Sequence, residues 1–169
     1  MTNISSTSLN KPVLSEGSTG EAVRELQRLL LPHGVFYYVD SNHACVFPGE
    51  EVIDGIFGPA TTDAVKIFQS KMFLPQDGIV DDRTWRAAYF SRPVDMPLLR
   101  RGDRGELVEL IQQRLSNGGY YRSAIDGDFG PGTESAVKDL QISAGLDIDG
   151  IVGDDTWSEL SKLYADLCL

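Results

Sequence analysis

The sequence is poor in the residues that define several common classes of protein. Among 169 residues there are two cysteines, Cys45 and Cys168, and two histidines. Two cysteines allow at most one disulfide, which excludes a disulfide-rich scaffold and leaves open whether this pair is bridged. His33 and His43 together with Cys45 are too few for a zinc site of about four ligands. We therefore expect no metal and no cofactor.

Long apolar runs and an excess of positive charge are also missing. No segment approaches the run of about 20 apolar residues that a membrane-spanning helix needs. The chain has 15 basic and 25 acidic residues, which gives a net charge of −10. Both halves are acidic, with 7 basic and 11 acidic residues in 1–90 and with 8 and 14 in 91–169. We therefore expect no nucleic-acid partner and no membrane insertion.

The amino-terminal stretch lacks the features of a secretory signal. Residues 1–10 are dominated by serine, threonine and asparagine and contain neither a basic nor a long apolar region. This composition predicts a flexible tail over residues 1–10, with no visible export signal.

What the sequence does contain is a tandem duplication. GSTGEAV at residues 17–23 is matched by GDRGELV at 102–108, an offset of 85, and DGIFGP at 54–59 is matched by DGDFGP at 126–131, an offset of 72. The smaller second offset places an inserted segment in the first copy. The predicted organisation is unit 1 at 11–90 with an insertion at about 35–53, a linker with two prolines at 91–97, and unit 2 at 98–169.

Each unit is predicted to be a small three-helix bundle, so the fold class is mainly all-α. The first helix follows Gly20 or Gly105, where apolar residues recur with helical spacing. The second helix starts at Pro59 or Pro131, because proline suits the first helical turn. The third follows the second D-G turn of each unit. In the insertion, β-prone runs at 36–39 and 44–47 flank a polar turn and predict a short hairpin or loop.

The two units share an ordered set of motifs: G-x-x-G-x-x-V, D-G-x-F-G-P-x-T-x-x-A-V, D-G-I-V and T-W. This set resembles the peptidoglycan-binding domain often joined to bacterial cell-wall hydrolases, and the resemblance covers nearly all of residues 14–163. It implies a three-helix bundle that attaches to peptidoglycan without catalysis, through its stem peptide and glycan. It also implies location in the cell wall or periplasm, and a cell-wall hydrolase or another protein as a further partner.

The loop before the second helix offers a site for a stem-peptide carboxylate. Gly58 and Gly130 fall at the N-cap and bring no side-chain acceptor, so the first-turn N–H groups are left for an anion. The alternative is that side chains of the protein satisfy these donors internally. The residues that would either contact the ligand or satisfy the donors are Asp54, Thr61, Asp126 and Thr133.

Four further residues complete the predicted ligand-binding set. Gln69 and Gln141 each offer a donor and an acceptor, which suits either a peptide backbone or a bridge between loops inside the bundle. Tyr38 and Tyr121 belong to tyrosine pairs that precede the D-G loops. Tyrosine is amphipathic, so these rings suit stacking on a sugar, and half-buried surface tyrosines fit the same pattern.

No catalytic residues are predicted. Asp54, Asp77, Asp126 and Asp149 each precede a glycine, which is typical of turns. A glycosidase needs two carboxylates in one cleft, one of them with a raised pKa, and the sequence shows no such pair. The prediction is a non-catalytic tandem binding module. The alternatives are a structural or protein-interaction module on the same fold and a cell-wall hydrolase with an unrecognised site.

Overall fold

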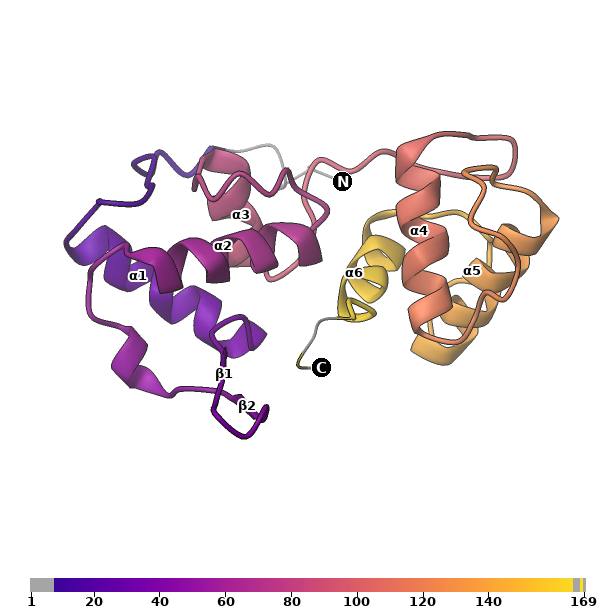
Figure 1. The fold of residues 1–169 in the computed structure, drawn as a ribbon. Coiled ribbons are helices and arrows are strands. Elements are labelled where there is room, and N and C mark those ends of the chain that lie inside the picture. The colour runs from indigo at the N-terminus through magenta and orange to yellow at the C-terminus, as the bar shows by residue number, and fades with distance from the viewer. Residues whose placement is uncertain (1–7, 166–167, 169) are drawn as a thin grey trace. The chain divides into compact units, whose positions relative to one another are not determined.

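The computed structural model describes residues 8–165 and residue 168, and these residues form six α-helices, two short 3₁₀ helices and one small sheet (Figure 1). The chain divides into two compact units between Asp95 and Met96, and Cys168 groups with unit 1. The predicted mainly all-α fold class is confirmed. Most of the predicted tail, residues 1–7, lies outside the described residues, while the N–H of Leu9 donates to Asp82 in unit 1.

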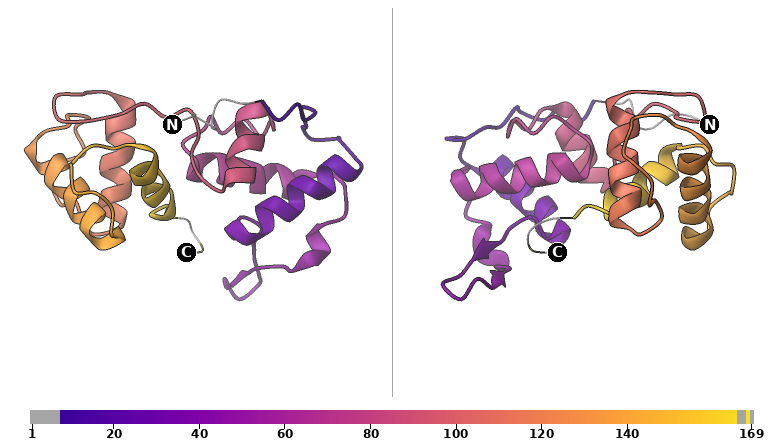
Figure 2. Two further views of the ribbon diagram at one scale, coloured as in Figure 1. Left: turned by 180° about the vertical axis from the view of Figure 1, so that it is seen from behind. Right: turned by 45° about the vertical axis from the view of Figure 1, so that its right-hand side comes forward.

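Unit 1 contains three α-helices and the inserted segment. In chain order its elements are α1 (Glu21–Leu30), η2 (Leu31–His33), β1 (Tyr38–Val39), β2 (Cys45–Val46), η3 (Glu50–Val52), α2 (Pro59–Lys71) and α3 (Asp82–Phe90). β1 and β2 pair in antiparallel register, and the Asp40 carboxylate accepts from the N–H groups of Asn42 and Ala44 to close the turn. This hairpin projects from the unit on the side away from α3 (Figure 2).

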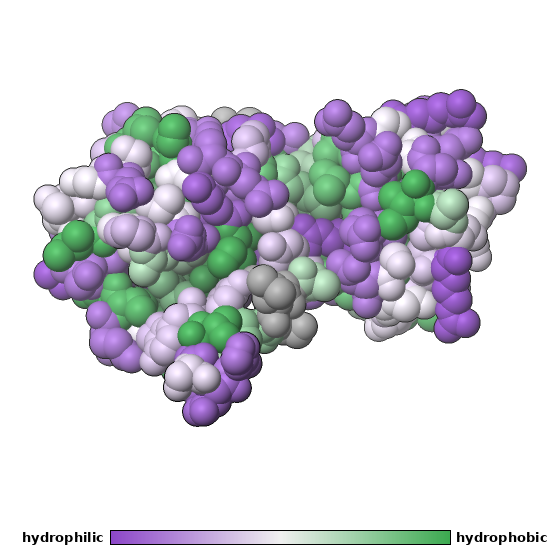
Figure 3. Space-filling model, viewed as in Figure 1, coloured by the Kyte–Doolittle hydropathy of each residue, from purple (hydrophilic) through white to green (hydrophobic). Residues whose placement is uncertain are grey.

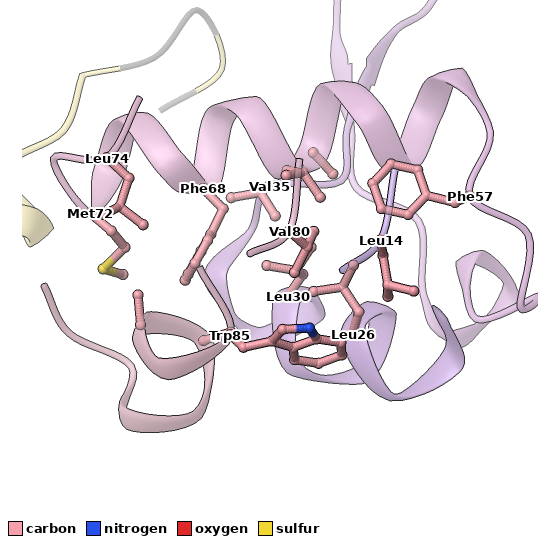
Figure 4. Packing of buried hydrophobic residues seen from close by; sticks show 14 of the residues in the cluster. Leu14, Leu26, Leu30, Val35, Phe57, Phe68, Met72, Leu74, Val80 and Trp85 are labelled. Carbon is pink, nitrogen blue, oxygen red and sulfur yellow. The ribbon is translucent and has the colours of Figure 1, made fainter. Parts of the chain in front are cut away.

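The core of unit 1 lies between its three helices. Leu26 and Leu30 of α1, Phe68 of α2 and Trp85 of α3 are fully buried and point toward one another (Figure 4). Spacings of three and four residues on each helix place these side chains on one face, as the apolar pattern predicts. The indole N–H of Trp85 donates to the carbonyl oxygen of Pro12 at 2.8 Å, so the largest core residue has no unsatisfied polar group.

Unit 2 repeats this architecture without the insertion. Its helices are α4 (Glu106–Asn117), α5 (Pro131–Ala144) and α6 (Asp154–Lys162). The duplication extends to individual hydrogen bonds: the indole N–H of Trp157 donates to the carbonyl oxygen of Pro97 at 2.8 Å, the counterpart of the Trp85 bond. The isolated bridge between Leu14 and Val80 likewise recurs between Leu99 and Val152. The two units are therefore copies in tertiary structure as well as in sequence.

The two cysteines, whose state the sequence leaves open, are bonded to each other in the structure. The disulfide attaches Cys168 to Cys45 in strand β2 of the inserted hairpin. Among the described residues, no helix is long and apolar enough to span a bilayer.

Candidate binding site

The D-G loops of each unit fold around buried glutamines. In unit 1 the Nε2 group of Gln27 donates to the Asp54 carboxylate at 2.9 Å and to the Thr61 hydroxyl at 3.1 Å. It also donates to the carbonyl oxygen of Ile56 at 3.2 Å. The Oε1 atom of Gln27 accepts from the Gly55 N–H at 2.9 Å. Both ends of the amide group thus hold the loop against the helix that carries the glutamine.

The same arrangement occurs four times in the described chain, twice in each unit. The glutamines are Gln27, Gln69, Gln112 and Gln141, and their aspartate and threonine partners are Asp54 with Thr61, Asp77 with Thr84, Asp126 with Thr133 and Asp149 with Thr156. The glycine after each aspartate has φ between 68° and 77°, a left-handed conformation that glycine adopts without strain. Each unit is therefore built from two successive helix–loop modules that share the middle helix.

Asp54, Asp126 and Asp149 of these loops have lowered pKa values, which favours their ionised form. The hydrogen bond from Gln27 is the main cause of the lowered pKa of Asp54, and the bond from Gln112 has the same effect on the pKa of Asp126. The pKa of Asp149 is lowered chiefly by the backbone N–H of Ile151 and then by Gln141. These carboxylates act as acceptors inside their own loops, which is how an aspartate before a glycine commonly folds.

This network places most of the predicted polar ligand contacts in internal roles. Gln69 and Gln141 are buried and bridge loops within the bundle, which is the second of the two interpretations of those residues. The hydroxyl groups of Thr61 and Thr133 are buried too. Each of the four side chains is hydrogen-bonded within its own unit, and Thr61, Gln69 and Gln141 also border pockets. The sequence held a usable signal for this role, since the threonine always follows the aspartate by seven residues.

The predicted helix N-termini keep their donors. Gly58 and Gly130 are the N-caps of α2 and α5, both in extended conformation, and no side chain caps either helix. By contrast, the Asp81 carboxylate caps α3 by accepting from the Thr84 N–H at 2.8 Å. The first N–H groups of an α-helix have no partner within the helix, so α2 and α5 each present a partial positive charge.

A pocket of about 320 Å³ lies at the N-terminus of α2. Gly58, Pro59 and Ala60 line it from the start of α2, and Phe36 and Val52, which precede and follow the inserted hairpin, line it as well. The Asp54 and Thr61 positions also border this pocket. The backbone donors of α2 therefore lie next to a space that a small polar group can occupy.

The two predicted sugar-stacking tyrosines have opposite environments. Tyr38, in β1, is 57% exposed, whereas Tyr121 is only 6% exposed. The Tyr121 hydroxyl donates to the carbonyl oxygen of Ala124 at 2.9 Å and accepts from Gln112 at 3.2 Å. Tyr121 matches the buried Phe36 of unit 1 at the offset of 85, so its ring packs inside unit 2 and does not face solvent. Tyr38 has no counterpart, because it lies in the insertion.

A second pocket, of about 440 Å³, separates the inserted segment from α2. It shares Phe36, Val52 and Ala60 with the pocket at the helix N-terminus, so the two pockets adjoin. Sequence reasoning missed Asp63 and Ile67, two of the α2 residues that line it. Their spacing of four places them on one helix face, but nothing in the sequence indicated that the insertion would fold back across that face.

These features define a tandem of helical modules, each with its D-G loops locked by buried glutamines. The chain belongs to the putative peptidoglycan binding domain family, whose model matches residues 19–88 in unit 1 and 104–160 in unit 2. The resemblance inferred from the motifs is thereby confirmed.

Similar proteins include enzymes of cell-wall turnover. Across 89% of its length the chain is 30% identical to the N-acetylmuramoyl-L-alanine amidase CwlL of Bacillus licheniformis, covering 46% of that protein. Across 88% it is 31% identical to the N-acetylmuramoyl-L-alanine amidase CwlM of Mycobacterium tuberculosis, covering 36% of that protein. The chain thus spans less than half the length of these relatives. The crystal structure of the SleB N-terminal domain is 39% identical, with a TM-score of 0.39, over 39% of this chain and 90% of that one.

Proposed function

We propose that the chain binds bacterial peptidoglycan without cleaving it, using both units. The observation that carries the proposal is the family match in each unit, together with the uncapped N-termini of α2 and α5. Two linked modules would strengthen retention on a polymer well beyond that of one module, provided that both can engage it.

The proposed contact is between a stem-peptide carboxylate and a helix N-terminus. In unit 1 the backbone N–H groups of Ala60 and Thr61 start α2, and Ala60 lines the adjoining pocket. In unit 2 Gly132 and Thr133 occupy the same positions in α5. A carboxylate is favoured there because the helix dipole and the free donors act together. The net charge of −10 repels anions at long range. The attraction for a carboxylate must therefore come from the N–H groups that it contacts directly.

The absence of cleavage is proposed from the state of the repeated carboxylates. A general acid for glycosidic cleavage needs a raised pKa, whereas the pKa values of Asp54, Asp126 and Asp149 are all lowered. These groups are also engaged by glutamines of their own loops. A carboxylate held in this way supports a loop and is a poor proton donor.

Retention on purified, insoluble sacculi tests the proposal. The whole chain should sediment with sacculi and should release neither reducing sugars nor peptide fragments. The paired substitutions Ala60→Glu and Gly132→Glu should weaken sedimentation, because a carboxylate in the first helical turn repels the ligand's own. Glutamic acid is well tolerated at a helix start, so both variants should fold.

A matched control separates charge from bulk. Ala60→Gln with Gly132→Gln adds nearly the same volume without the charge, and it should sediment better than the glutamate pair. Full sedimentation of the glutamate pair would contradict the helix-terminus contact. Fragment release by the wild-type chain would instead establish the alternative, a cell-wall hydrolase.

A further inference from the structure

We propose that the groove between the inserted hairpin and α2 is a subsite for a neutral N-acetylated sugar of the glycan strand, present in unit 1 alone. The inference rests on the proposed peptidoglycan binding and names the part of the polymer that unit 1 would recognise. The volume of about 440 Å³ lies within the range of small-molecule sites, roughly 300–1,000 Å³.

The chemistry of the groove walls suits a sugar ring. Tyr37 and Tyr38 line it from the inserted segment, and the apolar residues Ala64 and Ile67 line it from α2. Asp63 is the one acidic side chain among the lining residues, and it is exposed. A pyranose has an apolar face that packs on an aromatic ring, and hydroxyl groups that donate to a carboxylate. Aromatic walls and a single acceptor therefore match both parts of the ligand.

The charge of Asp63 disfavours two other occupants of the groove, a stem peptide and an apolar segment of a partner protein. A stem peptide carries carboxylates, which Asp63 and the net charge of −10 repel. A wholly apolar partner segment would leave the Asp63 carboxylate desolvated without a hydrogen-bond donor, which is costly. A neutral, amphipathic ring avoids both penalties. In the space-filling view apolar residues lie around the base of the projecting hairpin, with hydrophilic residues at its tip (Figure 3).

Unit 2 lacks the parts of this groove. At the offset of 72, Ile67 is matched by Asp139 and Asp63 by Ser135, so the helix face is polar where unit 1 is apolar and uncharged where unit 1 is acidic. The hairpin that carries Tyr38 has no counterpart there. The inserted segment and the α2 face thus differ from unit 2 together, as expected if they form one site.

The groove adjoins the pocket at the N-terminus of α2, which would set the direction of the ligand. Phe36, Val52 and Ala60 border both the groove and the pocket at the N-terminus of α2. A sugar beside Tyr38 would therefore direct its lactyl-linked peptide toward the α2 donors. Unit 1 would bind the sugar and the carboxylate together, and unit 2 would bind the carboxylate alone.

The test is calorimetric titration of the whole chain with two separate probes. One is a β-1,4-linked N-acetylglucosamine tetramer, and the other is a stem tetrapeptide without sugar. The tetramer should bind, and Tyr38→Ala should weaken that binding about tenfold, as expected for loss of an aromatic wall. Asp63→Asn should weaken it less, and Tyr38→Phe should retain most of it. Because Tyr38 and Asp63 are exposed, these variants should keep the fold.

Tyr120→Ala in unit 2 is the matched control and should leave tetramer binding unchanged. The inference is overturned if the tetramer does not bind, if Tyr38→Ala and Asp63→Asn bind it as the wild type does, or if tetrapeptide binding is the one that Tyr38→Ala abolishes. Sacculus retention separates the two proposals: a chain that sediments with sacculi but ignores the tetramer refutes the sugar subsite alone. A chain that does neither refutes both.

Discussion

Units 1 and 2 share an interior and differ at the surface. In both, a tryptophan of the third helix donates to a proline carbonyl oxygen at 2.8 Å, and glutamines lock both D-G loops. Around this common interior, unit 1 has a hairpin that unit 2 lacks, and Ile67 on α2 is matched by Asp139 on α5. The two copies therefore keep in common the contacts that the bundle needs in order to fold, and their differences lie at the surface.

One pair of matched residues differs by a single hydroxyl group, and its surroundings differ between the two units. Phe36 and Tyr121 occupy equivalent buried positions. In unit 2 the phenolic hydroxyl joins the glutamine network through Gln112 and Ala124. In unit 1 the phenylalanine ring has no hydroxyl and borders the groove beneath the insertion. The same position thus strengthens the interior of one unit and lines a cavity in the other.

Removal of the core tryptophans should give the largest effect and tests whether the units fold independently. Trp85→Ala and Trp157→Ala each remove a fully buried indole and should cost about 3–5 kcal/mol in their own unit. Because each unit has one tryptophan, the remaining indole reports on the other unit by fluorescence during denaturant unfolding. If the remaining indole showed that the unmutated unit also unfolds at lower denaturant in either variant, the two interiors would be coupled.

Removal of a buried glutamine should have the next largest effect. Gln112→Ala leaves the Gly127 N–H, which lies 3.0 Å from the glutamine oxygen, without its acceptor, and should cost about 1–3 kcal/mol. Gln27→Ala should cost slightly less, since Phe36 takes the place of Tyr121 in unit 1 and offers Gln27 no hydroxyl group. The control is Gln113→Ala, an exposed neighbour that bonds only to Asn117 in the described structure and should change stability little. Denaturant midpoints measure all three.

The Tyr121→Phe substitution makes unit 2 resemble unit 1 at this position. It removes one hydroxyl and its bonds to Ala124 and Gln112, so unit 2 should lose about 0.5–1.5 kcal/mol. Hydrogen exchange of α4 amides would detect the change. An unchanged exchange rate would mean that the hydroxyl adds nothing to the network, and the contrast with Phe36 would then lack an energetic basis.

Acid should weaken both units through their loop aspartates, with a small contribution from each. The folded-state pKa values of Asp54, Asp126 and Asp149 are lowered, so their stabilisation is present above the unfolded value, about 3.9, and is lost as the pH falls through the folded values. Unfolding midpoints should therefore hold near neutral pH and fall below about pH 4. In Asp54→Asn, the unfolding midpoint of unit 1 should fall less steeply with acid than it does for unit 1 of the wild type. An unchanged fall in unit 1 of this variant would assign the acid sensitivity of unit 1 to other groups.

Much of the scaffold could be read directly from the chain. The motifs at 54–59 and 126–131, with their offset, predicted two all-α units, and Pro59 and Pro131 marked helix starts that the structure confirms. The paired runs around Asp40 predicted the hairpin. These signals are local: a proline, a D-G turn and an apolar repeat each restrict the backbone within a few residues.

The roles of the site residues could not be read in the same way. Gln69 looked equally suited to a ligand and to the interior, because a side chain's partners depend on segments that are distant in sequence. Tyr38 and Tyr121 looked alike in sequence, yet one is exposed and the other buried. Whether a tyrosine faces water depends on the packing of its neighbours, and the insertion changed those neighbours in one unit only.

The sequence by itself determined the duplication, the helical interior and the turns, because periodic burial and restricted backbone angles act over short distances. Only the tertiary structure decided that the insertion lies against α2 and forms a groove with Asp63 and Ile67, and that Cys45 bonds to Cys168. These outcomes join segments far apart in the chain. They depend on which surfaces remain to be buried once each bundle has formed, and a local sequence pattern does not predict those surfaces.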